Sequence, residues 1–555
     1  MHRASGTFII MARVSSSFVG GCISIKSFKM AVQKGDLAPV TRFGFPLLVL
    51  ALAALVYGLY GFDGVLLRDY SIYLYSGQMM AEGIPPYVSV FDHKGPLSPM
   101  IAGFGAMLSK VFGGDDVYAV RFVFYATACL TVVAIYLLGK SVFQSQKAGF
   151  LAALTFLGFY AYAQAAASGP EPKTPMVLFE ALCLMFMVRK KWFWSGLFGS
   201  LAFLVWQPMG AFAFVTFLLA ATRPREERYG AALRAAAGIA VPLVATAAYF
   251  LYKGALYDFY NGFILFNFTH LARGSTDIAH VLAGAAVNIA LPYATMLVPI
   301  LIGLLTILRL YFKRPFEYRF LPLLLTLPAP VIWSLRDFQL ADDFYVFLPY
   351  AAVGFGAFLD TAARLTSNPR LLSAILGAIL LTIALANTWD EVSAGPAQKL
   401  TGTTVDLPTQ RAGALEIEER FGEDINIASI NSPQVLVLLH RQNPNPYLWI
   451  TAGVDQEIEA SYPGGFEGWL QDLEDSDTGA ISFFGEGQSL LPSSLLTREN
   501  YKTLDAWLNP RYRAEQIGPF WLFVKKDLLL EEARRNTNAV ESPGSSESLV
   551  DAESR

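Results

Sequence analysis

Long apolar segments recur along most of this chain, and they constrain its fold more than any other feature. A helix needs about 20 mostly apolar residues to cross the hydrocarbon core of a bilayer. Segments that approach or meet this requirement fall at 43–62, 118–139, 148–168, 175–188, 192–207, 209–221, 229–252, 283–312, 317–335, 343–360 and 371–389. Only 16 % of the residues are charged, against about 25 % in soluble domains. The sequence therefore predicts an α-helical polytopic membrane protein with about 11 spans.

The stretch 192–221 has to be divided to give this number. As one helix it would be about 45 Å long, which exceeds a single crossing. Basic clusters stand at both of its ends, at 189–191 and at 223–228. Basic loops are typically cytoplasmic, so we expect a short hairpin that turns at Gln207-Pro208.

Charge also predicts the orientation. Residues 1–42 are basic and precede the first span, which indicates a cytoplasmic N-terminal segment. Basic clusters recur in every second connection, whereas the alternate loops, at 63–117, 169–174, 253–282 and 336–342, are acidic or mixed. An odd number of spans places the chain after residue 390 on the extracytoplasmic side. The predicted location is the cell membrane.

Composition changes after the last span. In 391–533, short apolar segments at 425–430, 480–484 and 520–524 predict strands. They alternate with helical stretches, which is typical of an α/β domain. Residues 534–555 are polar and without apolar periodicity, which is typical of a disordered tail. The predicted organisation is a cytoplasmic segment (1–42), a transmembrane domain (43–390) with a long first outer loop (63–117), an extracytoplasmic α/β domain (391–533) and a tail (534–555).

Several classes of site are disfavoured. The net charge of −3 gives no basic footprint for nucleic acid. The five histidines make no metal-ligand spacing, and no divalent metal or other cofactor is supported. Asp115 and Asp116 are adjacent and precede a span, so we interpret them as helix caps rather than metal ligands. We expect Arg121 to pair with one of them.

The chemistry concentrates in the first outer loop, which is long for a connection yet rich in apolar and aromatic residues. Its first part, residues 61–100, holds Asp63, Arg68, Asp69, Glu82, Asp92, His93 and Lys94. The run Leu97–Phe112 is apolar but interrupted by Lys110, which predicts a helix that lies along the membrane interface.

This loop resembles the first outer loop of GT-C fold glycosyltransferases. It has an acidic residue after the first span, then a tyrosine, then G-x-P-P-Y at 83–87 and D-x-K-G-P-L at 92–97. The group it resembles comprises the polyprenyl-phosphate and dolichyl-phosphate-mannose mannosyltransferases and related bacterial transferases. Segments 113–122, 194–210 and 342–350 are also similar to that group, but Gln207 and Asp343 depart from its pattern, so the sugar stays open.

The resemblance implies an inverting transferase that moves a sugar, mannose first and arabinose or an aminosugar as alternatives, from a polyprenyl-phosphate donor to an extracytoplasmic acceptor. Such a transfer needs a carboxylate as general base. The resemblance gives this role to Asp69, which could instead cap the helix that begins near Tyr70. Asp63 is the rival base.

Cations are needed at the departing phosphate. Arg68, Lys94 and Arg336 are the predicted donor-phosphate ligands; alternatively, Lys94 and Arg336 extend toward lipid headgroups and Arg68 pairs with a carboxylate. The predicted substrate-binding residues are Tyr70, Asp92, His93 and Glu171. The alternative for Asp92 and His93 is that they hold the loop together, and Glu171 could simply belong to a polar turn.

The expected partners are the lipid-linked sugar, a glycan, lipid or protein acceptor, and the bilayer. A transporter or flippase of a lipid-linked saccharide is one alternative, and it predicts charges near the middle of spans. Glu180 and Arg309 lie within spans, but both are nearer an end than the centre. A non-catalytic membrane assembly protein is the other alternative.

Overall fold

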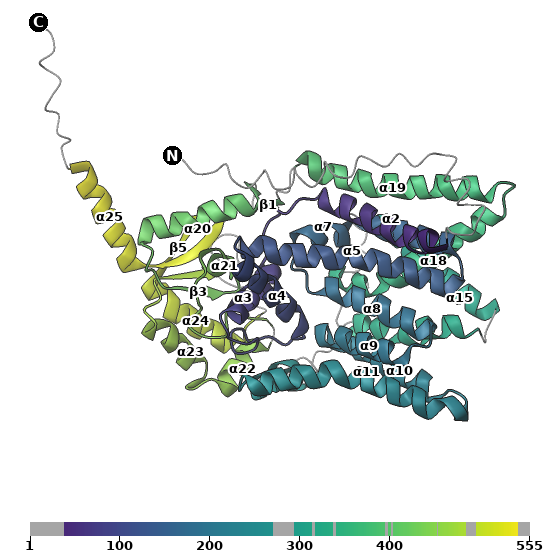
Figure 1. Ribbon diagram of the computed structural model, residues 1–555. Helices are drawn as coiled ribbons and strands as arrows, with labels where there is room; N and C mark the ends of the chain where they lie inside the picture. Colours follow the sequence, from purple (N-terminus) through teal and green to yellow (C-terminus); the bar gives the residue numbers. More distant parts are fainter. Residues whose placement is uncertain are drawn as a thin grey trace, which may run out of the picture. The chain divides into compact units, whose positions relative to one another are not determined.

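The computed structural model describes residues 38–269, 294–313, 317–336, 340–394, 398–400, 403–451, 453–483 and 495–541 (Figure 1). Residues 49–555 form one compact unit and residues 1–48 another. The smaller unit holds the first half of helix α2 (Ala38–Gly58). The larger unit is mostly helical and contains everything that follows.

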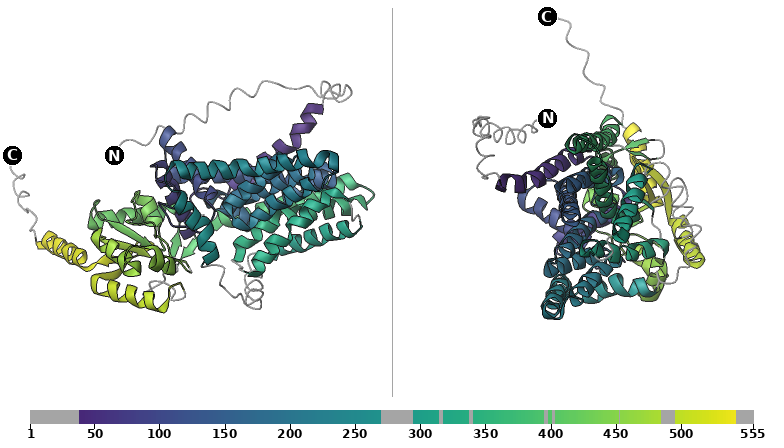
Figure 2. Two further views of the ribbon diagram at one scale, coloured as in Figure 1. Left: turned by 90° about the horizontal axis from the view of Figure 1, so that it is seen from below. Right: turned by 90° about the vertical axis from the view of Figure 1, so that its right-hand side faces the viewer.

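Helices follow one another through the segments predicted to span the membrane. They are α5 (Asp116–Phe143), α6 (Gln146–Leu157), α7 (Tyr160–Ser168), α8 (Lys173–Val188), α9 (Trp192–Val205), α10 (Gly210–Ala221), α11 (Arg225–Tyr252), α15 (Ala294–Lys313), α16 (Leu321–Thr326), α17 (Pro328–Arg336), α18 (Leu348–Arg364) and α19 (Pro369–Ala394). Figure 2 shows several of them running alongside one another. Their packed faces share one large apolar core.

The number of spans is smaller by length than the sequence predicts. Within the described residues, five helices are long and apolar enough to cross a membrane, and six if the bent pair α6 and α7 counts as one. Their bend of 69° divides the span predicted at 148–168. Helices α9 and α10 are short and separated by a 3-10 turn at Gln207–Met209, as the predicted hairpin requires. A multi-pass membrane protein is confirmed; the number 11 is not.

Glycines allow the closest approach between two of these helices. A Cβ atom on Gly354 of α18 would lie 2.1 Å from the carbonyl oxygen of Gly303 on α15. Small residues are typical of such contacts in membrane helices, because backbones then approach closely. The glycine pair therefore fixes how α15 packs against α18.

The chain after residue 397 forms two small sheets. Strands β1 (Gln398–Leu400) and β2 (Thr403–Val405) make an antiparallel pair. The second sheet has the order β3-β4-β6-β5: β3 (Ile427–Ile430) is parallel to β4 (Ala480–Phe483), while β6 (Phe520–Lys525) is antiparallel to both β4 and β5 (Tyr512–Ile517). β3, β4 and β6 coincide with predicted strands. β3 and β4 are buried throughout, since helices cover this sheet.

The helices of this segment are α20 (Leu407–Phe421), α21 (Gln434–Leu439), α22 (Val454–Ser461), α23 (Gly465–Asp475), α24 (Arg498–Arg511) and α25 (Lys526–Glu541). Helix α25 continues beyond the predicted start of the tail at residue 534, and residues 542–555 lie outside the described part. The domain boundary at 390 stays a prediction, because residues 49–555 are compact as a whole.

The first outer loop contains helices α3 (Arg68–Ala81) and α4 (Leu97–Phe112). It shares an apolar core with the chain after residue 400: Leu66, Ile72 and Tyr75 belong to the same cluster as Leu407, Val435 and Leu448. Figure 1 shows α3 and α4 beside α21. Residues more than 300 positions apart thus build one structure around the loop.

Candidate functional site

Asp69 lies in the first turn of α3, where a carboxylate is favoured by the helix dipole. The helix begins at Arg68, and its N-cap residue Leu67 makes no side-chain cap hydrogen bond, so Asp69 is not the N-cap. Its Oδ1 accepts a 2.9 Å hydrogen bond from Nε of Arg68. Its Oδ2 lies 3.8 Å from Nζ of Lys94. The predicted base and two predicted phosphate ligands are therefore together.

These charges decide the ionisation of Asp69. Burial by itself raises the pKa of this carboxyl, but Lys94 and Arg68 counter the effect, with His93 adding a little, and hold the pKa below its ordinary value. Asp69 is therefore a carboxylate near neutral pH. It can accept a proton without first having to lose one.

Two further motif residues position Lys94. Tyr87, the last residue of G-x-P-P-Y, donates a 2.6 Å hydrogen bond from its hydroxyl to the carbonyl oxygen of Lys94. The backbone N–H of Lys94 donates to Oδ1 of Asp92 at 3.1 Å. Nζ of Lys94 lies 5.7 Å and 5.6 Å from the ring centres of Tyr73 and Trp449, within range of cation–π attraction. The ammonium group of Lys94 therefore lies among Asp69, Tyr73 and Trp449.

Asp92 is buried and the neighbouring His93 is half-buried, with its Nδ1 3.8 Å from Oδ1 of Asp92. Burial raises the pKa of Asp92, and Lys94 offsets part of that shift. Burial and the charge of Lys94 lower the pKa of His93 to about 3, so its imidazole is neutral. Nδ1 of His93 has no hydrogen-bond partner in the described part of the chain. Asp92 binds the backbone of the loop, as its structural interpretation predicts.

Trp449 joins this loop from the far end of the chain. Its Nε1 donates a 2.9 Å hydrogen bond to the carbonyl oxygen of Phe91, and its ring stacks on His93 with centres 5.7 Å apart. The backbone N–H of Phe91 donates to the carbonyl oxygen of Pro446 at 2.9 Å. The segment after β3 thus holds the loop at the residues that precede Lys94.

Replacing Trp449 by Phe should lower activity without unfolding the protein. The substitution keeps an aromatic ring beside His93 and removes the hydrogen bond to Phe91, which is one of the bonds that position the loop before Lys94. We expect the KM for the lipid-linked donor to rise about tenfold, the size of one lost hydrogen bond. The measurement is steady-state release of polyprenyl phosphate. An unchanged KM would refute this positioning role.

Gln207 and Asn267 hold the same loop through its backbone at His93. Their side-chain amides donate to the carbonyl oxygen of His93 at 2.6 Å and 2.8 Å. Gln207 also donates to the carbonyl oxygen of Phe263 at 3.2 Å. Gln207, which departs from the family pattern, therefore fixes the position of the loop backbone in this protein.

Gly95 brings the loop against the end of α9. A Cβ atom at this position would lie 2.0 Å from the carbonyl oxygen of Leu204, so a side chain requires the backbone to move. We expect Gly95→Ala to destabilise the fold by about 1–3 kcal/mol, as overpacking does, and to lower the Tm of the purified protein. Gly44→Ala is the control, because nothing lies within 4 Å of its Cβ position and its helical backbone accepts any side chain. Equal Tm values for the two variants would contradict this account.

Tyr73 is a member of the site that the sequence did not single out. Its hydroxyl is buried and has no hydrogen-bond partner among the described residues. Burial raises its pKa well above 10, and the charges of Asp92, Asp69 and Glu171 raise it further. The hydroxyl is therefore a neutral donor among three carboxylates. The helical spacing of four from Asp69 places both on one face of α3, which is the signal that could have found it.

Glu171 is buried in the turn before α8. Its Oε1 accepts a 3.1 Å hydrogen bond from the backbone of Lys173, whose Nζ lies 4.8 Å from the ring centre of Trp206. This bond is what the interpretation as a polar turn requires. The charge of Glu171 nevertheless raises the pKa of Tyr73, so Glu171 is close enough to act on the site electrostatically.

Other predicted residues lie elsewhere. The carboxylate of Asp63 accepts a 2.5 Å hydrogen bond from the Tyr118 hydroxyl, away from Lys94. Tyr70 packs at the edge of the core shared with the C-terminal segment, so its role in binding substrate stays a prediction. The side chain of Arg336 lies outside the described residues, as does that of Asp343.

The expectations for the start of α5 are confirmed in part. Asp115 is its N-cap and accepts a 3.1 Å hydrogen bond from the backbone of Tyr118. The predicted pairing of Arg121 with Asp115 or Asp116 is wrong. Arg121 is fully buried and instead donates to the carbonyl oxygens of Phe62 and Gly169, because it points inward from the helix. No group of three metal-ligating side chains occurs in the described part of the chain.

Comparisons with known proteins give a partial family match and a shared fold. Residues 93–250 match the family described as dolichyl-phosphate-mannose-protein mannosyltransferase. No curated protein matches the whole sequence significantly. The match covers less than a third of the chain and begins inside the loop, at His93.

Solved structures are similar over most of the chain. ArnT from Cupriavidus metallidurans in the apo state is 12 % identical, with a TM-score of 0.57, and the alignment covers 87 % of this chain and 98 % of ArnT. The structure of ArnT bound to undecaprenyl phosphate is 12 % identical, with a TM-score of 0.56 and coverages of 88 % and 99 %. The archaeal oligosaccharyltransferase AglB from Archaeoglobus fulgidus is 14 % identical, with a TM-score of 0.46 and coverages of 79 % and 69 %. The resemblance to GT-C proteins predicted from the first outer loop is thus confirmed, and the chain has the GT-C fold of ArnT.

Proposed function

We propose that this GT-C fold protein is a membrane glycosyltransferase that moves a sugar from a polyprenyl-phosphate donor to a hydroxyl group of an extracytoplasmic acceptor. The observation that carries the proposal is the position of Asp69 between Arg68 and Lys94 at the start of α3. The fold of ArnT, solved with undecaprenyl phosphate, and the partial match to the mannosyltransferase family support it. Mannose is the proposed sugar, with arabinose and an aminosugar as the alternatives.

The proposed step is a single displacement. The acceptor hydroxyl oxygen attacks the anomeric carbon while Asp69 takes its proton. The bond between this carbon and the phosphate oxygen breaks, and the electron pair leaves with polyprenyl phosphate, which Lys94 and Arg68 stabilise. One displacement inverts the configuration. No acid catalyst is needed, because phosphate is a good leaving group.

The orientation follows from the same proposal. The basic segment before α2 is cytoplasmic and the segment after α19 is extracytoplasmic, in agreement with the distribution of basic loops. The acceptor, a glycan, lipid or protein, then reaches Asp69 from outside. Glycosylation mapping with engineered acceptor sites after residue 400 tests this side.

The test of the function is a reconstitution. The purified protein in liposomes is supplied with polyprenyl-phosphate mannose, arabinose and an aminosugar in turn, with membrane extract as the source of acceptors, and free polyprenyl phosphate is measured. Release with one donor supports the proposal and identifies the sugar. No release with any donor would favour a transporter of a lipid-linked saccharide or an assembly protein.

The pH profile tests which carboxylate is the base. Asp69 acts in its ionised form, and its pKa in the folded protein is below the ordinary value of an aspartic acid. The enzyme is therefore fully active above this lowered pKa and loses activity only as the pH falls through it. We therefore expect kcat/KM to be constant from about pH 5 to 8. His93, with a pKa of about 3, adds no inflection there. An inflection inside this window would show that the base is a group with a higher pKa than Asp69, and Asp92 would be tested first, because burial raises its pKa.

A further inference from the structure

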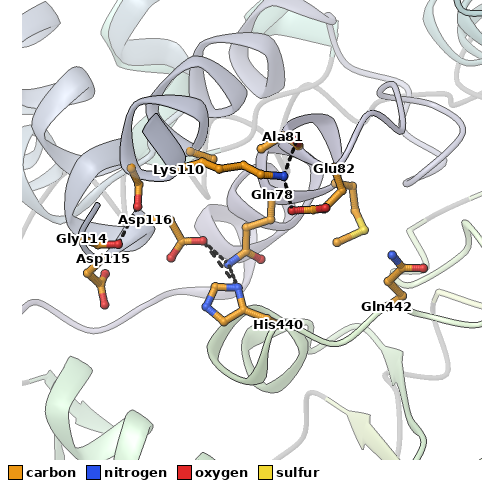
Figure 3. A pocket seen from close by; sticks show the side chains of 12 residues that line it. Gln78, Ala81, Glu82, Lys110, Gly114, Asp115, Asp116, His440 and Gln442 are labelled. Carbon is orange, nitrogen blue, oxygen red and sulfur yellow. Dashed lines mark hydrogen bonds and ion pairs between the residues drawn. The ribbon is translucent and has the colours of Figure 1, made fainter. Parts of the chain in front are cut away.

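A cavity lies at the opposite end of helix α3 from Asp69. We call it the α3–α21 pocket; its principal polar residues are Gln78, Glu82, Lys110, Asp115, Asp116 and His440, and its volume is about 500 Å³ (Figure 3). The residues come from α3, α4, the start of α5 and the end of α21. Nine positions separate Asp69 from Gln78, which is about 14 Å along the helix axis. The cavity is therefore distinct from the site around Lys94.

Most charges in the pocket neutralise one another. Glu82 pairs with Lys110 at 2.9 Å, and Asp115 pairs with Arg411 at 2.5 Å. Asp116 differs, because no lysine or arginine pairs with it among the described residues. Its Oδ2 accepts a 2.8 Å hydrogen bond from Nε2 of Gln78 and lies 3.7 Å from Nδ1 of His440. The pocket thus keeps one carboxylate that can accept further hydrogen bonds.

Gln78 is a second residue of the pocket with a side-chain oxygen that lacks a hydrogen-bond donor. Its side chain is 5 % exposed, and Nε2 donates to Asp116 and to the carbonyl oxygen of Val437. Because both of these partners are acceptors, the atom that faces them is the nitrogen Nε2, and the other atom of the amide group is the oxygen Oε1. Oε1 has no hydrogen-bond partner in the described part of the chain. A buried acceptor without a donor is costly, and a ligand that brings a donor would satisfy it.

We propose that the α3–α21 pocket binds a hydroxyl-rich saccharide, the part of the acceptor that lies remote from the reacting hydroxyl. The groups left without partners are acceptors, so the ligand has to supply O–H donors. The carboxylate of Asp116, which no lysine or arginine of the described residues neutralises, disfavours a phosphate or another anion. The volume is that of an ordinary small-molecule site. The inference rests on the proposed function, because it makes the acceptor a glycan or a glycan-bearing molecule. Binding at a distance from Asp69 would contribute to orienting the acceptor.

Saturation-transfer NMR on the full-length protein in nanodiscs tests the pocket directly. The probes are neutral trisaccharides of mannose, glucose, galactose and N-acetylglucosamine, together with the cationic trisaccharide of glucosamine. We expect saturation transfer to at least one neutral trisaccharide, and a Kd about tenfold higher in Gln78→Leu and Asp116→Asn, each of which changes one free acceptor. Asp505→Asn on α24, outside the pocket, is the matched control and should bind as the parent does.

The outcomes separate this inference from the proposed function, because binding needs no catalysis. The Asp69→Asn protein should bind the trisaccharide as the parent does. If the reconstituted protein releases polyprenyl phosphate but no neutral trisaccharide shows saturation transfer in the NMR experiment, the pocket inference is overturned and the proposed function stands. Saturation transfer to the glucosamine trisaccharide alone would overturn the pocket inference in favour of a cationic ligand. Equal Kd values in the parent and in whichever of the two variants remains monodisperse would place the saccharide elsewhere.

Discussion

Asp69→Asn is expected to lower the rate of sugar transfer by about 10³-fold, because an amide cannot take the proton of the acceptor hydroxyl. The substitution preserves the size of the side chain and one acceptor oxygen for Arg68. The fall should therefore appear in kcat, with a smaller change in the KM for the donor. The measurement is the release of polyprenyl phosphate by reconstituted protein under saturating donor.

Asp63→Asn is the matched control for this experiment. Asp63 stands in the same loop but bonds to Tyr118, so its replacement should leave kcat within about twofold of the parent. Full activity of Asp69→Asn together with loss in Asp63→Asn would move the base to Asp63. Loss in neither would direct the search to Glu171 and Asp92.

The second large effect is expected from Lys94→Gln. Lys94 is the cation that Asp92 and Tyr87 hold toward Asp69, and a charged hydrogen bond to phosphate contributes about 1.5–3 kcal/mol. The KM for the donor and the inhibition constant of free polyprenyl phosphate should both rise roughly 100-fold. Both constants follow from the release assay, the second with added product.

Lys253→Gln serves as its control, since that lysine is exposed and donates to the carbonyl oxygen of Gly83. A KM as low as in the parent would show that Lys94 does not contact the phosphate. Removal of Lys94 also takes away a charge that lowers the pKa of Asp69. The variant should therefore lose activity at a higher pH than the parent when the pH is lowered.

The sequence predicts where most helices lie, because their apolar composition marks them, but it does not predict how many are long enough to cross a bilayer. It does not reveal that 148–168 bends sharply between Leu157 and Tyr160, since no proline marks the bend. The strands β3, β4 and β6 could be predicted because they are short apolar runs. β5 could not, because its polar and apolar residues do not alternate in the regular way of a half-buried strand.

For the site, motifs predict the members that belong to one loop. Asp69, Asp92, His93 and Lys94 lie close enough in sequence for their proximity to follow from the pattern. Trp449 and Gln207 could not be predicted as their neighbours, because a long-range contact leaves no periodic signal in a single sequence. The inward orientation of Arg121 depends on where the carbonyl oxygens of Phe62 and Gly169 fall, which only the packed fold determines.

The hydrogen bond from Trp449 to Phe91 joins residues 358 positions apart, and this separation has a consequence for the order of synthesis. A ribosome that adds about 5–20 residues per second completes Trp449 roughly 20 to 70 seconds after the loop itself has been made. During this interval the membrane helices can insert, but the loop lacks the ring that holds His93 and Lys94. We therefore expect a chain that stops before residue 449 to lack this hydrogen bond and to leave the loop around His93 and Lys94 unordered, although its membrane helices are already complete.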